Sequence, residues 1–146
     1  MNIDIMDLQD CVKIDKRSVI KCAKTVLNVM GEKRAELSLL FVNDSYIKRL
    51  NWQYRRLRSK TDVLAFSMRS EKALGDVSKN ILGDVVVSTE TAKKEAKKRN
   101  IPIQREMNLY LIHGILHLLG YDDKKALDTK KMKAKEKEIL RIVGES

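Results

Sequence analysis

The two histidines of the chain, His113 and His117, are four residues apart in a strongly apolar segment. On an α-helix this spacing places both imidazoles on one face, one turn apart. Gly120 can then end the helix in a left-handed conformation. The carboxylates of Asp122 and Asp123 can reach the histidine face from the turn that follows. Two imidazole nitrogens and one carboxylate oxygen around an open position are typical of a catalytic metal site.

The histidine pair also has a plainer interpretation, in which both imidazoles are core side chains with ordinary hydrogen bonds. The surrounding segment is apolar on nearly all sides, as in a helix that packs against several neighbours. Burying two unpaired imidazoles is costly, and metal coordination removes that cost. The spacing and the following carboxylates therefore favour a metal site.

The residue after the first histidine indicates which metal chemistry to expect. A zinc protease helix carries glutamate directly after its first histidine, where it acts as the general base. This chain has Gly114 there, although its spacing otherwise follows the longer metalloprotease motif. The missing glutamate argues for a hydrolysis other than that of peptides.

Hydrophobic periodicity predicts the elements that must position these residues. We expect a single α+β domain over residues 1–146, with about four strands in a mixed sheet and about five helices. The central helix is expected to be buried and to bind the metal. The predicted strands cover residues 2–7, 35–42, 61–68 and 81–87. The predicted helices cover 15–30, a segment from the 43–45 cap through 54, 88–100, 104–119 and 128–143. Residues 69–80 are polar and predict a loop.

Composition indicates the class of partner and the compartment. The 146 residues carry a formal net charge of +10, which favours a polyanionic partner such as nucleic acid. No apolar run approaches the roughly 20 residues that span a bilayer, and the first residues lack a secretory pattern. Two cysteines, Cys11 and Cys22, form no disulfide framework and are expected to be reduced. We therefore expect a cytoplasmic protein without a membrane partner.

Four motifs in this order resemble those of the YbeY endoribonucleases, a family of rRNA maturation factors. The family signature His-Gly-x-Leu-His-Leu-x-Gly-Tyr-Asp-His is matched from His113 to Asp122, and only its last position differs. Upstream, Leu50-Asn51 with Tyr54-Arg55 is similar to Leu-Asn-x-x-Tyr-Arg. The segment 61–67 is similar to Thr-Asp-Val-Leu-Ser-Phe-Pro, and 82–84 reads Leu-Gly-Asp. The motifs extend over nearly the whole chain.

The resemblance implies a metal-dependent endoribonuclease that cleaves single-stranded RNA in 16S rRNA maturation and ribosome quality control. It implies one zinc ion per chain held by His113, His117 and the third signature position, and Arg55 as the residue that faces the metal and contacts RNA. The expected partners are 16S rRNA precursor and the small ribosomal subunit, with no DNA.

The third signature position is Asp123 where the family has histidine. A carboxylate oxygen binds zinc at a distance similar to that of imidazole nitrogen, so Asp123 is the expected third metal ligand. The added negative charge favours harder ions, so nickel or manganese are alternatives to zinc. Asp122 is the competing candidate ligand. If neither carboxylate binds, the chain is instead a ribosome-binding maturation module with weakened catalysis; a metallopeptidase-like hydrolase is a more distant alternative.

Two further side chains receive structural interpretations. Glu106 lies two turns before His113 on the same helix face, and we expect it in a surface ion pair rather than in catalysis. Trp52 is expected to be a packing residue. The basic run around Arg55 combines cations with the aromatic Tyr54, a combination that suits contact with single-stranded RNA.

Overall fold

The computed structural model describes residues 1–69, 80–122 and 124–145. Its strands β1 (Asn2–Asp7), β2 (Glu36–Val42), β3 (Val63–Ser67) and β4 (Ile81–Ser88) form one sheet in the order β1-β2-β4-β3. β2 pairs in parallel with β1 and β4, while β3 is antiparallel to β4, which confirms the mixed sheet. Most of the predicted loop at 69–80, and Asp123, lie outside the described residues.

The helices are α1 (Lys16–Val29), α2 (Asp44–Arg55), α4 (Thr89–Arg99), α5 (Ile103–Leu118) and α6 (Ala126–Glu145). Their ends lie within two residues of the predicted ones because the end signals act locally. Asp15 accepts hydrogen bonds from the first backbone N–H groups of α1, as expected of an N-cap residue. Within the described residues, no helix has the length and apolar character needed to cross a membrane.

The two faces of β2 separate the two parts of the hydrophobic core. Leu37, Leu39 and Phe41 point to the side covered by α1, α5 and α6, and all three are buried. Leu40 and Val42 point to the other side, where Ile47 of α2 packs. This alternation is the one that the sequence predicts for a strand buried on both faces.

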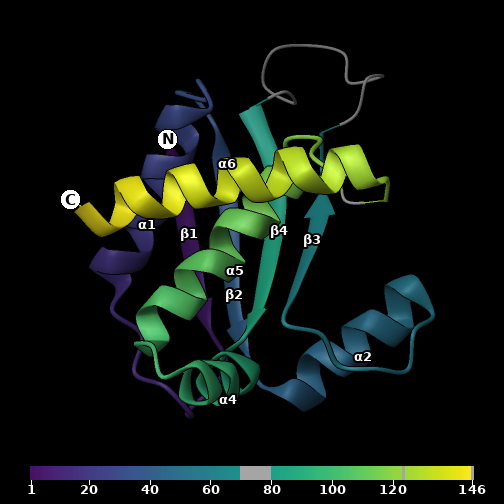
Figure 1. Ribbon diagram of the computed structural model, residues 1–146. Coiled ribbons are helices and arrows are strands. Elements are labelled where there is room, and N and C mark those ends of the chain that lie inside the picture. Colours follow the sequence, from purple (N-terminus) through teal and green to yellow (C-terminus); the bar gives the residue numbers. More distant parts are fainter. Residues whose placement is uncertain (70–79, 123, 146) are drawn as a thin grey trace.

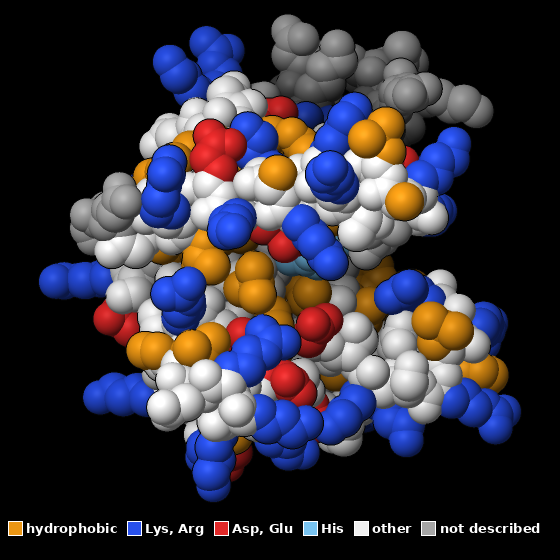
Figure 2. Space-filling model, in the orientation of Figure 1, with side chains coloured by type: hydrophobic (Ala, Val, Ile, Leu, Met, Phe, Trp, Pro, Cys, Tyr) orange, Lys and Arg blue, Asp and Glu red, His pale blue; other side chains and the backbone are white. Residues whose placement is uncertain are grey.

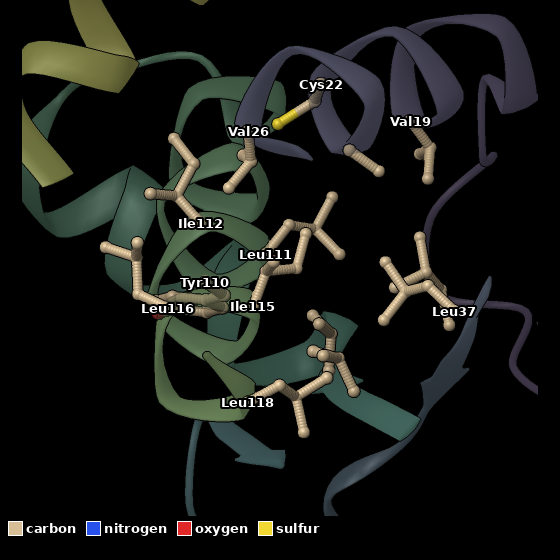
Figure 3. Close-up of a cluster of buried hydrophobic side chains, with 14 of the residues drawn as sticks. Val19, Cys22, Val26, Leu37, Tyr110, Leu111, Ile112, Ile115, Leu116 and Leu118 are labelled. Carbon is tan, nitrogen blue, oxygen red and sulfur yellow. The ribbon is translucent and has the colours of Figure 1, made fainter. Parts of the chain in front are cut away.

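Helix α5 lies at the centre of the larger core. In Figure 1 it crosses the sheet beneath α6, with α1 beside it. Val19, Cys22 and Val26 of α1 face Leu111 and Ile112 of α5, as Figure 3 shows. Because α5 packs against α1, α6 and the sheet, its buried residues occupy most of its circumference, as the sequence predicts.

Gly83 allows β3 to pair closely with β4. Its φ of +142° is a conformation that L side chains rarely adopt, and a Cβ there would lie 2.1 Å from the carbonyl oxygen of Phe66. The register of β4 against β2 also shifts at this point, as at a β-bulge. The glycine of the Leu-Gly-Asp motif is thus a requirement of the backbone that holds β3 beside α5.

Asp44 connects the start of α2 to the end of β4 and the start of α4. One carboxylate oxygen accepts hydrogen bonds from Ser88 Oγ at 2.6 Å and Thr91 Oγ1 at 2.7 Å, and the other lies 3.2 Å from Lys60 Nζ. Burial alone would raise the pKa of Asp44, but these hydrogen bonds outweigh it and lower the pKa to about 2. The network fixes the orientation of α2, which carries Arg55.

Candidate active site

A cavity of about 750 Å³ lies between the C-terminal half of α5, strand β3 and the end of α2. His113 and His117 line it from α5, and Arg55 lines it from α2. The turn after α5, from Gly120 to Asp122, lines it as well. Figure 2 shows histidine surface in a hollow near the centre of this face, with charged side chains of both signs above it and hydrophobic side chains below it. Arg55 therefore meets the two histidines in one cavity, although it is distant from them in the sequence.

The two imidazoles of α5 converge on each other. The Nε2 atoms of His113 and His117 are 3.0 Å apart, and the ring planes meet at 67°. This follows from their i, i+4 spacing, which stacks the two side chains along one side of the helix. Two nitrogens at this distance either share a hydrogen bond or direct both lone pairs at one cation.

Glu136 contacts His113 from the opposite side of the ring. Its Oε1 atom accepts a hydrogen bond from Nδ1 of His113, and the side chain is only 12 % exposed. A carboxylate can only accept here, so Nδ1 carries the proton and the lone pair of the neutral ring is on Nε2, which faces His117. Sequence reasoning missed Glu136. The signal was present, because Glu136 lies one turn after Met132 and one turn before Leu140 on the inner face of α6.

Arg55 is the last residue of α2, and its side chain is exposed. It forms no ion pair with any carboxylate among the described residues, although it lines the same cavity as the histidines. A guanidinium in this position offers several N–H donors in a fixed plane, which suits a phosphate group. The predicted anion-binding residue is thus placed beside the predicted metal-binding residues.

The turn after α5 begins with Gly120, which has the left-handed φ of +98° that the sequence predicts. Asp122 lines the cavity, and its Oδ1 atom accepts a hydrogen bond from the backbone N–H of Lys124 at 2.7 Å. That oxygen therefore stabilises the turn. Asp123, the expected third ligand, lies outside the described residues. Among the residues that are described, no set of three or more His, Cys, Asp or Glu side chains is gathered as a metal site.

Gly114 lies in a close contact between α5 and the sheet. A Cβ atom there would lie 2.5 Å from Cγ1 of Val85 and 3.2 Å from Cγ2 of Val63. A glutamate at this position would have to enter the packed contact between α5 and β4. The general base of a zinc protease therefore has no room at its usual position in this helix, which weakens the peptidase interpretation.

The expectation that Glu106 forms a surface ion pair is wrong. Glu106 does pair with Arg99, at 3.2 Å, but the carboxylate is buried and only 1 % exposed, so this is not a surface ion pair. Its other oxygen accepts a hydrogen bond from the hydroxyl of Tyr110 at 2.8 Å. Burial, and then this hydrogen bond, raise the pKa of Tyr110. Glu106 is not among the residues that line the cavity, so its contribution is to the structure of α5.

Comparisons with known proteins show which family the sequence and the fold are similar to. The family model described as Endoribonuclease YbeY matches residues 4–144. A protein from Syntrophus aciditrophicus named Endoribonuclease YbeY is 37 % identical over 142 residues, which cover 96 % of this chain and 88 % of that protein. One from Pelotomaculum thermopropionicum with the same name is 40 % identical over 145 residues, covering 96 % and 95 %. The solution structure of a Thermotoga maritima protein superposes with a TM-score of 0.66 at 27 % identity, covering 97 % of this chain and 88 % of that one.

Proposed function

The chain belongs to the YbeY endoribonuclease family, and on this premise we propose that it is a metal-dependent enzyme that cleaves single-stranded RNA in 16S rRNA maturation and ribosome quality control. Membership makes it an endoribonuclease, a hydrolase that acts on RNA. The metal, the preference for single strands and the ribosomal substrate are the finer parts of the proposal. The single observation that carries it is the convergence of two histidine nitrogens in a cavity that Arg55 also lines, an arginine without an ion pair to any of the described carboxylates.

The histidine pair fits a bound metal ion. Zinc–nitrogen bonds are about 2.0–2.1 Å long, so two nitrogens that share one ion lie at most about 4.2 Å apart. The Nε2 atoms of His113 and His117, at 3.0 Å, meet this condition. We propose Asp123 as the third ligand, from its place in the family signature. Two imidazoles and a carboxylate suit zinc, and the hard oxygen ligand leaves nickel or manganese as alternatives.

Glu136 orients His113 for metal binding. By accepting a hydrogen bond from Nδ1–H, its carboxylate fixes the tautomer in which Nε2 is free of a proton. Carboxylates commonly hold metal-binding histidines in this way, which also raises the basicity of the ring. Glu136 belongs to α6, so the docking of the last helix on α5 completes the site.

The remaining chemistry comes from groups around the cavity. When bound, the metal ion would supply Lewis-acid activation of a phosphate oxygen or of a water molecule. Arg55 would bind the phosphate and stabilise the negative charge that grows on it during cleavage. Tyr54, which is 61 % exposed and packs against Phe66 with ring centroids 5.1 Å apart, offers a surface on which an unpaired base can stack. These contacts support a single-stranded substrate.

The ribosomal setting of this activity is proposed from the family. The net charge of +10 suits an RNA substrate and the RNA-rich surface of the small ribosomal subunit. We propose that the whole chain, residues 1–146, acts as one catalytic domain in the cytoplasm. DNA and membranes are not expected partners.

Metal analysis and RNA cleavage test the proposal together. We expect the purified protein to contain about one zinc, nickel or manganese ion per chain, and His117→Ala to lose it. Arg55→Glu should reduce cleavage of single-stranded RNA at least about a hundredfold, by analogy with removal of other groups that stabilise transition-state charge, and should retain the metal. Arg105→Glu, on α5 but away from the cavity, is the matched control. Equal loss of metal and activity in Arg55→Glu would show that this arginine is structural.

The second candidate function, an RNA-binding maturation module with weakened catalysis, applies if Asp123, which stands where the family signature has histidine, does not bind a metal. In that case the wild type would bind RNA but would contain no stoichiometric metal, and Asp123→His would restore metal binding and cleavage.

A further inference from the structure

The outer surface of α2 carries an exposed tryptophan among cations. Trp52 was expected to be a packing residue, but its side chain is 41 % exposed. The guanidinium of Arg58 lies 4.8 Å from its ring centroid and that of Arg56 lies 5.6 Å away. Lys48 and Arg49 line a shallow hollow of about 350 Å³ with Trp52 and Arg58. We call these five residues the Trp52 platform. Figure 2 shows Lys, Arg and hydrophobic side chains together over α2.

The backbone at Arg56 has a conformation that is unfavourable for arginine. Arg56 ends α2 with a φ of 57°, in the left-handed region where helices usually place glycine. Asn100 has nearly the same conformation, φ 55°, at the end of α4, but asparagine tolerates it better than arginine does. An unfavourable residue at a cap points to a function of its side chain, and here that side chain lies over Trp52.

The charge of this surface is not balanced locally. Residues 45–61 contain six Lys and Arg and no Asp or Glu. Lys60 pairs with Asp44, at 3.2 Å. Within the described part of the chain, the four cations of the platform form no ion pair with a carboxylate. A planar aromatic group among uncompensated cations has the chemistry that recognises single-stranded nucleic acid, by base stacking and phosphate contacts.

We propose that the Trp52 platform is a second RNA-binding surface, which holds the single strand as it leaves the catalytic cavity. The connection is short, because Arg55 lines the cavity and Arg56, the next residue, lies over Trp52. A strand bound to Arg55 is therefore led onto the outer face of α2. The inference rests on the proposed function, since it assigns a further contact to the same substrate.

Binding of two oligouridylates with a hydrolysis-resistant phosphorothioate backbone tests the platform. One of about 4 nucleotides fits the cavity alone, and one of about 16 also reaches α2. Loss of one stacked base weakens binding about tenfold, so Trp52→Ala should bind the long probe about tenfold more weakly and the short probe as wild type does. Arg56→Gly should weaken binding of the long probe about threefold and reduce its salt dependence, while the melting temperature stays the same or rises.

Asn100→Gly is the matched control for Arg56→Gly. It changes a left-handed helix cap in the same way but lies outside the platform, so its affinity for both probes should equal that of the wild type. If Trp52→Ala and Arg56→Gly bind the long probe as tightly as the wild type does, the inference is overturned. That result would also be expected if the platform binds an acidic protein instead of RNA. If the wild type binds neither probe, it is the proposed function that fails, which is a distinguishable result.

Discussion

Replacing Gly114 by alanine should loosen the contact between the helix that carries the histidines and the sheet beneath it. The new Cβ would lie 2.5 Å from Cγ1 of Val85, a stiff β-branched side chain in the middle of β4 that is fully buried. Overpacking of this kind costs about 1–3 kcal/mol of the free energy of unfolding. Alanine gains about 1 kcal/mol over glycine from its helix propensity, so we expect a net loss of about 0–2 kcal/mol.

Gly144→Ala separates the two contributions. Gly144 is also helical, near the end of α6, but a Cβ there meets nothing within 4 Å. This variant should therefore be neutral or slightly more stable than the wild type. For a chain of this size, about 1 kcal/mol corresponds to roughly 3–4 °C, so Gly114→Ala should melt about 3–10 °C below Gly144→Ala by circular dichroism. Urea unfolding with unchanged m-values would confirm that native-state stability is responsible.

A double-mutant cycle gives the result that would refute this reasoning. Val85→Ala removes the methyl group that the new Cβ would strike, at the expense of a cavity. Gly114→Ala should therefore cost at least about 1 kcal/mol less in the Val85→Ala background than in the wild type. Additive effects of the two substitutions would show that the close approach of α5 to β4 is not what requires glycine.

Two further predictions concern carboxylates. Glu136→Gln should lower the zinc affinity about 10–100-fold in a chelator competition and change the His113 tautomer seen by ¹⁵N NMR of the metal-free protein. Glu138→Gln, at an exposed position on the same helix, is the control and should do neither. If Glu136→Gln and the wild type bind zinc with equal affinity, Glu136 does not belong to the site. The pKa of Asp44 is lowered from 3.8 to about 2, so its contribution of about 2 kcal/mol to stability is present above pH 4 and is lost as the pH falls toward 2. Urea unfolding of Asp44→Asn should lack this part of the acid dependence, and an acid dependence identical to that of the wild type would assign it to other groups.

Local signals predicted the elements of this fold well, because caps and periodicity act over a few residues. Asp15 and Gly31 delimit α1 as expected, and the faces of β2 follow its alternation. The order β1-β2-β4-β3 did not follow from such signals, since it depends on contacts between distant segments. The burial of Glu106 was missed for the same reason, because its ion-pair partner Arg99 belongs to the preceding helix and reaches the buried carboxylate from the surface.

The parts of the candidate site that lie within one helix could be predicted from the sequence. The contacts that join two helices were harder to predict. His113 and His117 meet because they are one turn apart on α5. Arg55 was placed in the site by resemblance, and it does line the same cavity. Glu136 approaches from α6, whose docking onto α5 no local pattern encodes. A lone carboxylate on the apolar face of a helix was nevertheless a usable signal, because such a group requires a buried partner.

The polar groups of α5 explain why this nearly all-apolar helix has a unique orientation. Glu106, Tyr110, His113 and His117 follow one another at steps of three or four residues and form a single stripe. Each has a partner in the structure: Arg99 for Glu106, Glu106 for Tyr110, Glu136 for His113, and His113 for His117. Rotation of α5 by one residue would preserve much of its apolar contact and the hydrogen bonds within the helix. It would, however, separate Glu106 from Arg99 and His113 from Glu136, and a buried polar group left unpaired costs about 1–3 kcal/mol. The stripe therefore fixes the rotation that directs both imidazoles into the cavity, so the residues proposed for metal binding also help to specify how their own helix packs.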